Sequence, residues 1–94
     1  MKVGALFPDA VGAIAERDCC VVTADSRQVT QGSVFVAISG AKADGRRYIA
    51  DAVARGAVVI VAEGPRPADL PTAILYHQVA EARLALAQAA ARLY

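Results

Sequence analysis

Two short polar segments carry the residue types best suited to hold a ligand. Asp25, Ser26 and Arg27 form the first, and residues 40–45 form the second. A serine hydroxyl both donates and accepts hydrogen bonds, so Ser26 beside exposed backbone groups suits the edge of a heterocycle such as uracil. A structural role is favoured when the segment is taken alone. Asp25 and Ser26 would then bond to backbone N–H groups of their own turn, while Arg27 pairs with an acid.

The second segment combines glycines with basic residues at the start of a predicted helix. Gly40 and Gly45 let the backbone approach a ligand closely, or simply form the turn. Lys42, Arg46 and Arg47 cluster at the helix N-terminus, where unpaired N–H groups favour an anion such as a diphosphate. The structural alternative places the arginines on a solvated helix face, and it is favoured without further observations.

The sequence predicts no catalytic residue and no metal ligand. His77 is expected at a strand end in a structural or solvent-exposed role. The adjacent Cys19 and Cys20 match neither a metal-binding CxxC motif nor a disulfide framework. The sequence has no Gly-x-x-x-x-Gly-Lys-Ser/Thr loop and no GxGxxG motif. We therefore expect these 94 residues to bind no cofactor.

An α/β domain must position the two polar segments. Strands are predicted at 20–22, 33–38, 58–61 and 73–76, and helices at 9–16, 46–55 and 79–93. The run at 33–38 is apolar without alternation, which is typical of a strand covered on both faces. A strand–helix–strand unit with short connections implies a parallel, right-handed crossover. The predicted fold is a small mixed sheet of about four strands with packed helices.

The helix predicted at 46–55 is amphipathic. Asp44 lies where its carboxylate would cap the helix N-terminus, and Gly56 follows as the usual C-terminal cap residue. The apolar positions of this helix are Tyr48, Ile49, Ala52 and Val53.

Length and composition limit the class of protein. The 94 residues suit one domain, with 56% hydrophobic residues for its core. A net charge of +1 argues against nucleic-acid binding by charge alone. The longest apolar run is far too short to cross a membrane, and the N-terminus does not match a signal peptide. We therefore expect a cytoplasmic domain that binds neither nucleic acid nor membrane.

A series of runs in the order 23–29, 32–37, 40–49 and 61–63, with Ala52 and Gly56 between the last two, carries a family resemblance. The series resembles the N-terminal domain of the Mur ligases of peptidoglycan synthesis, which builds the cell wall. The Ala-Asp-Gly-Arg-Arg-Tyr run is most similar to the MurE type, which adds the third residue of the stem peptide. The MurF type, which adds D-Ala-D-Ala, shares the Asp-Ser-Arg and Gly…Phe-Val-Ala signatures and is the alternative.

The resemblance implies that residues 1–94 dock the UDP part of UDP-MurNAc-L-Ala-D-Glu. Ala24 and Ser26 match positions where the family contacts the uridine side. Ala41, Lys42 and Ala43 match the positions at which the family's second turn closes on the ligand. Relatives often carry a larger apolar residue at position 24 and His-Gln at positions 41 and 42. Contacts through the backbone would survive those differences, whereas side-chain contacts at positions 24 and 41 would not.

The resemblance also implies that catalysis belongs to other domains. In the family a central ATPase domain with a Gly-Thr-Asn-Gly-Lys-Thr loop follows, and then a C-terminal domain that binds the incoming amino acid. The full-length enzyme would use ATP and Mg²⁺ to form an acyl phosphate on the D-Glu side chain, which the amine then attacks.

Neither of those domains is in these 94 residues, so we expect a non-catalytic part of a larger ligase, cut at a domain border. The overall similarity favours meso-diaminopimelate over L-Lys as the third amino acid. A stand-alone protein-interaction module of the same fold, using its last helix, is the second hypothesis.

Overall fold

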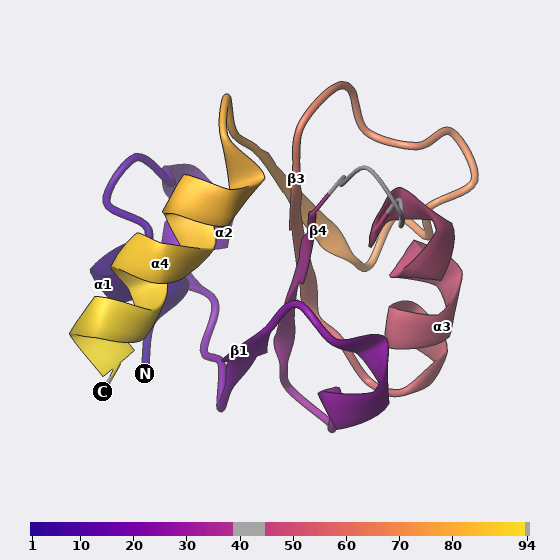
Figure 1. The fold of residues 1–94 in the computed structure, drawn as a ribbon, viewed down its shortest axis with the longest axis horizontal. Helices are drawn as coiled ribbons and strands as arrows, with labels where there is room; N and C mark the ends of the chain where they lie inside the picture. Colours follow the sequence, from indigo (N-terminus) through magenta and orange to yellow (C-terminus); the bar gives the residue numbers. More distant parts are fainter. Residues whose placement is uncertain (39–44, 94) are drawn as a thin grey trace.

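Four parallel strands form the centre of the molecule (Figure 1). The computed structural model describes residues 1–38 and 45–93. Its strands are β1 (Val22–Thr23), β2 (Val34–Ala37), β3 (Val59–Ala62) and β4 (Leu75–Gln78), arranged in the order β1-β2-β3-β4. Each of the three strand pairs is parallel. The predicted α/β class with four strands is confirmed, but the mixed sheet is wrong, because these four strands all run in one direction.

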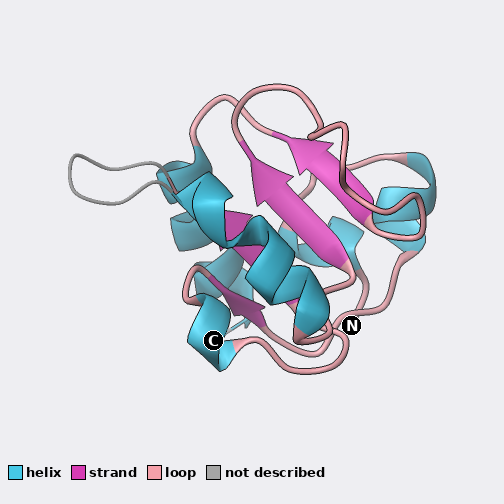
Figure 2. Cartoon of the chain, turned by 90° about the vertical axis from the view of Figure 1, so that its right-hand side faces the viewer, coloured by secondary structure: helices cyan, strands magenta, loops and turns pink. Residues whose placement is uncertain are grey.

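The connections between the strands explain that uniform direction. Right-handed crossovers between sequential neighbours place every connection on the same face of the sheet. That face carries the 3₁₀ helix η1 (Ser26–Gln28), then η2 (Gly45–Tyr48) with α3 (Ile49–Ala54), and the loop between β3 and β4. The opposite face is covered by α1 (Val3–Leu6), α2 (Gly12–Glu16) and α4 (Ala82–Leu93). Figure 1 shows these two groups on either side of the strands, and Figure 2 shows α3 in front of the strands.

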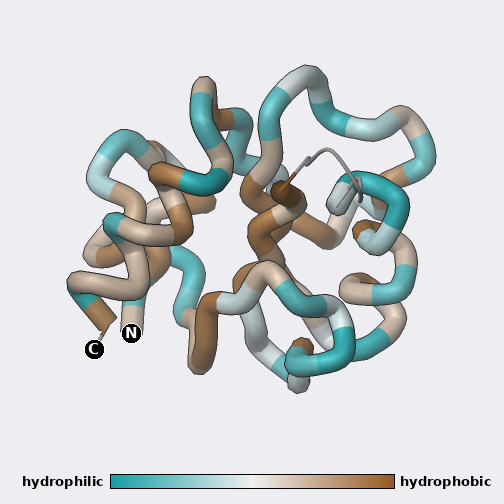
Figure 3. The backbone as a smooth tube through the Cα atoms, in the orientation of Figure 1, coloured by the Kyte–Doolittle hydropathy of each residue, from teal (hydrophilic) through white to brown (hydrophobic). Residues whose placement is uncertain are grey.

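The two faces of the sheet have separate hydrophobic cores. In β2, Val34 and Val36 pack toward α1 and α4, whereas Phe35 and Ala37 pack toward α3. All four residues are at most 1% exposed, which confirms the prediction of a strand covered on both faces. In Figure 3 the most hydrophobic backbone lies in the centre and hydrophilic residues are concentrated in the outer loops.

The predicted elements are present, but several of their limits differ. The helix predicted at 9–16 begins only at Gly12, and the separate helix α1 was not predicted. The helix predicted at 79–93 begins at Ala82. The strand predicted at 73–76 lies two residues later, as β4 at Leu75–Gln78, because Leu75 pairs with Val59 and Tyr76 pairs with Ile60.

Gly56 ends the unit formed by η2 and α3 as predicted. Its φ of 112° is a conformation that side-chain-bearing residues rarely adopt. A β-carbon there would also lie 2.7 Å from the backbone of Gln31. Glycine therefore lets the chain turn sharply from α3 into β3.

Candidate functional site

The first polar segment follows β1 at the carboxyl edge of the sheet. In open parallel sheets ligands bind at this edge, where the strand ends lie side by side. Thr23 ends β1, and its Oγ1 accepts a hydrogen bond from the Asp25 backbone N–H at 3.1 Å. Asp25 Oδ1 in turn accepts from the Arg27 backbone N–H at 3.0 Å and caps η1. The segment thus builds its own turn.

Asp25 and Arg27 also pair through their side chains. Arg27 Nε donates to Asp25 Oδ1 at 3.1 Å, and Nη2 donates to Oδ2 at 3.0 Å. The side-chain hydrogen bonding from Arg27, followed by the Arg27 backbone hydrogen bond, holds the pKa of the Asp25 carboxyl below its usual range. The structural interpretation of Asp25 and Arg27 is therefore confirmed.

The Ser26 hydroxyl takes no part in that turn. Ser26 is only 7% exposed, and its backbone carbonyl accepts from the Val29 N–H at 3.2 Å. Within the described ranges 1–38 and 45–93, the hydroxyl itself makes no hydrogen bond. The predicted capping role thus holds for Asp25 but not for the Ser26 side chain. Because it has no partner there, the Ser26 hydroxyl keeps its donor and acceptor capacity for a ligand.

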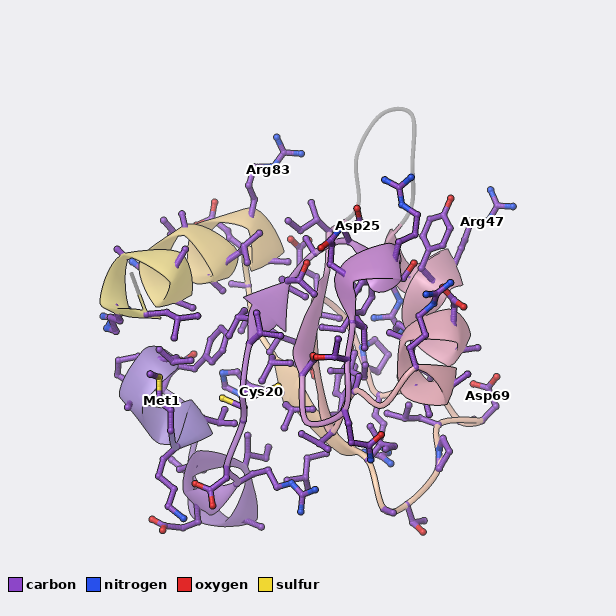
Figure 4. All side chains as sticks on the ribbon, turned by 90° about the horizontal axis from the view of Figure 1, so that it is seen from below. Met1, Cys20, Asp25, Arg47, Asp69 and Arg83 are labelled. Carbon is purple, nitrogen blue, oxygen red and sulfur yellow. The ribbon has the colours of Figure 1, made fainter. Side chains whose placement is uncertain are left out.

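Ala24 and Ser26 line one surface hollow of about 430 Å³, which we call the β1 hollow. Its wall consists of Ala24, Asp25, Ser26, Arg27, Tyr48 and Asp51. Figure 4 shows η1, which directly follows the labelled Asp25, beside α3. The structure therefore brings together the two predicted site residues that it describes. Whether they contact a ligand stays a prediction.

The other three predicted site residues, Ala41, Lys42 and Ala43, lie outside the described residues, as does the predicted cap Asp44. Gly45, the next described residue, is buried against the end of β2. A β-carbon at Gly45 would lie 2.6 Å from the Ile38 carbonyl oxygen, so only glycine fits this approach. Gly45 therefore enters η2 in close contact with Ile38.

Tyr48 is a wall residue that the sequence interpretation placed incorrectly. It was expected on the apolar side of an α-helix, but it is 47% exposed. Residues 45–48 form a 3₁₀ turn, in which each residue advances by a third of a circle, so Tyr48 leaves the buried stripe that begins at Ile49. The presence of an aromatic residue shortly after the glycine-containing turn could have indicated that Tyr48 belongs to the site.

Arg46 does not have the structural role considered for it. Its guanidinium donates to the carbonyl oxygens of Glu63 and Pro65 and to the Tyr76 hydroxyl, at 3.0 Å for Pro65 and 2.9 Å for Tyr76. It therefore binds the start of the β3–β4 loop rather than lying on a solvated helix face. Arg47 is exposed and points outward in Figure 4, as the structural alternative predicts.

A second hollow at the same edge is lined by carboxylates. Glu63 and Glu81 contribute to its wall together with Ile38 and Arg83. Glu63 Oε2 accepts a hydrogen bond from the Ala82 N–H at 2.8 Å and so caps α4. An anionic ligand at this helix N-terminus would have to displace that carboxylate. The β1 hollow is the better candidate for a nucleotide.

His77 lies inside β4 rather than at a strand end. It is 7% exposed, and its ring packs edge-on against Phe7 with the ring centres 6.0 Å apart. Its Nε2 lies 3.3 Å from Asp9 Oδ1, but the geometry is not that of a hydrogen bond. This position corresponds to the structural role predicted for the histidine and not to an exposed one.

Comparison with known proteins assigns the family. The model described as "Mur ligase family, catalytic domain" matches residues 20–94. The chain belongs to the Mur ligase family. This confirms the resemblance carried by the ordered runs from Thr23 onward.

The curated relatives of this Mur ligase chain include several diaminopimelate ligases. It is 48% identical over 73 residues to UDP-N-acetylmuramoyl-L-alanyl-D-glutamate–2,6-diaminopimelate ligase of Agrobacterium fabrum, covering 78% of this chain and 14% of the relative. It is 41% identical over 98 residues to the ligase of that name from a Chelativorans species, covering 100% of this chain and 20% of the relative. The chain thus spans about a fifth or less of these proteins.

Solved structures of MurF share the fold. A crystal structure of MurF from Acinetobacter baumannii superposes with a TM-score of 0.70 at 27% identity, covering 97% of this chain and 20% of that chain. MurF from Thermotoga maritima in complex with ADP superposes with a TM-score of 0.61 at 28% identity, covering 79% of this chain and 16% of that chain. The four-stranded α/β domain therefore recurs as a small part of larger Mur ligases.

The described residues do not supply a metal site. Residues 1–38 and 45–93 contain no group of three or more His, Cys, Asp or Glu side chains that could hold a metal ion. No helix in this part of the chain is long and apolar enough to cross a membrane.

Proposed function

We propose that this chain is the N-terminal, UDP-docking domain of a MurE-type ligase. The parent enzyme adds 2,6-diaminopimelate, as the third stem-peptide residue, to UDP-MurNAc-L-Ala-D-Glu in cytoplasmic peptidoglycan synthesis. The observation that carries the docking role is the Ser26 hydroxyl, which has no hydrogen-bond partner in the described chain and belongs to a residue that lines the β1 hollow. Identities of 41% and 48% to diaminopimelate ligases support the MurE type over the MurF type, whose structures share 27% and 28%.

The chemistry of uracil matches the groups in the β1 hollow. Its edge presents two carbonyl acceptors and one N–H donor, and the Ser26 hydroxyl can serve either kind of group. Ala24 precedes the turn with a small side chain, so a ligand can approach the backbone there. Ala41, Lys42 and Ala43 complete the proposed contact set from the second turn, through their backbone.

The remaining domains of the parent enzyme would perform the reaction. The family resemblance implies that ATP and Mg²⁺ activate the D-Glu side-chain carboxylate as an acyl phosphate. The described residues offer neither a metal cluster nor a phosphate loop, so no step through these groups is assigned to them. The part played by this chain is to bind and orient the UDP end of the substrate.

Ser26→Ala tests the docking role in the protein at its encoded length. We expect UDP binding, measured by calorimetry, to weaken by about 1–3 kcal/mol, which is roughly 5- to 150-fold, because the uracil group loses its buried partner. The KM for UDP-MurNAc-L-Ala-D-Glu should rise with kcat little changed.

Thr72→Ala is the matched control, because it removes an exposed hydroxyl just before β4, at the opposite end of the strands. Equal UDP affinity in the wild type and a folded Ser26→Ala protein would contradict the docking role. A reading frame that stops at Tyr94 would instead favour a stand-alone protein-interaction module.

A further inference from the structure

Tyr48 is a large aromatic side chain left half exposed beside a buried polar group. It is 47% exposed, yet it lies directly before Ile49, which is 6% exposed in the core. Together with Ser26 it forms part of the wall of the β1 hollow. An aromatic ring that faces a polar hollow offers a flat apolar surface to a ligand.

The charges around the hollow are already compensated. Asp25 pairs with Arg27 at 3.0 Å, and Asp51 pairs with Arg55 at 3.1 Å. Each acid in the wall therefore has its own arginine, and the hollow attracts neither a cation nor a phosphate strongly. This balance suits an uncharged, planar group that bonds through its edge and stacks through its face.

Resting on the proposed UDP-docking function, we infer that Tyr48 stacks on the face of the uracil ring while Ser26 binds its edge. The 3₁₀ turn at Gly45–Tyr48 gives Tyr48 this position by turning it away from the core below Ile49. Stacking on an aromatic side chain contributes strongly to nucleobase binding and needs no hydrogen bond from the phenol. Tyr48 thus contributes affinity for a nucleobase, separately from any residue that holds the diphosphate.

Three substitutions of Tyr48, made in the full-length protein, distinguish stacking from its other possible roles. For Tyr48→Ala and Tyr48→Leu we expect UDP to bind about fivefold more weakly or worse, whereas Tyr48→Phe stays within about twofold of the wild type. The KM for the UDP-linked substrate should follow the same order with kcat little changed. Leu84→Ala is the matched control, because Leu84 is 49% exposed on α4.

The outcomes distinguish this inference from the proposed function. Wild-type affinity in a folded Tyr48→Ala protein, with Ser26→Ala still weakened, overturns stacking and leaves the docking role in place. A loss in Tyr48→Phe equal to that in Tyr48→Ala overturns stacking in favour of a hydroxyl contact. Absence of UDP binding by the wild type overturns both proposals.

Discussion

The turn after β1 and the loop after β3 contain similar charged residues but use them differently. Two carbonyl oxygens of the loop after β3 accept from Arg46 of η2, which also donates to Tyr76 of β4. Arg66, in the loop itself, donates to the carbonyl oxygens of Pro71 at 2.7 Å and Ile74 at 2.8 Å. In the turn after β1, Arg27 pairs with its neighbour Asp25, and its side chain is 81% exposed.

The difference separates architecture from ligand binding. The loop after β3 has few backbone bonds of its own, so its carbonyl groups accept from side chains, from Arg66 within the loop and from the distant Arg46. The turn after β1 is completed by Thr23 and Asp25, so neither the Ser26 hydroxyl nor the Tyr48 side chain hydrogen-bonds within the described residues. Charged residues alone therefore did not mark the candidate site, and the side chain with unused hydrogen-bonding capacity did.

The largest effect on stability is expected from Arg46→Met. Removing the guanidinium leaves the carbonyl oxygens of Glu63 and Pro65 without this donor, which should lower the free energy of unfolding by about 1–3 kcal/mol. Arg47→Met, an exposed neighbour, should change it by less than about 0.5 kcal/mol. Urea denaturation of both variants measures the difference, and equal midpoints would show that Arg46 is not an architectural residue.

A smaller effect is expected from Glu63→Ala. Loss of the cap on Ala82 should destabilise α4 by about 0.5–2 kcal/mol, with Glu63→Gln less affected because it keeps an acceptor oxygen. Asp69→Asn is the control, since Asp69 is an exposed carboxylate in the same loop. Denaturation monitored by circular dichroism gives the values. UDP affinity should stay unchanged in the folded Glu63 variants, and a loss comparable to that of Ser26→Ala would move the candidate site to the second hollow.

The smallest effect is expected from Asp25→Asn, and it depends on pH. Because pairing with Arg27 lowers the pKa of Asp25, the pair stabilises the folded protein above the unfolded-state pKa and loses this effect as pH falls through the folded-state pKa. Asp25→Asn should therefore be slightly less stable than the wild type at pH 7, and the difference should vanish in acid and shrink in high salt. Carbon-13 titration of the Asp25 carboxyl checks the cause, and a midpoint at or above the usual range would contradict it.

The sequence predicted much of the fold because its local signals agree with one another. The apolar runs around Phe35 and Ile60 needed burial on both faces, and Gly56 marked the end of the helix before β3. The register of β4 was not predictable to the residue, because pairing with β3 rather than local pattern places Leu75 opposite Val59. The partners of Arg46 were hidden for a similar reason, since Glu63 and Tyr76 lie 17 and 30 residues away in the chain.

The candidate site was predicted only in part. Ser26 was found from the Asp-Ser-Arg segment and Ala24 from the family resemblance, and both line the β1 hollow. Tyr48 was missed, because a helical period of 3.6 puts it on the buried side and only the 3₁₀ turn moves it outward. The exposure of a side chain at a helix start depends on a change of helix type that residue preferences do not reveal.

By itself the sequence determined the family, the α/β class and the residues of the Asp25–Arg27 turn, because these depend on residue order and short-range hydrogen bonds. The tertiary structure alone decided which polar groups remain available for a ligand. Arg46 and Glu63 are used by backbone groups that folding brings to them, whereas the Ser26 hydroxyl meets no such group in the described chain. Which hydrogen-bonding groups remain unpaired after folding depends on tertiary packing, so a local pattern of residues does not predict it.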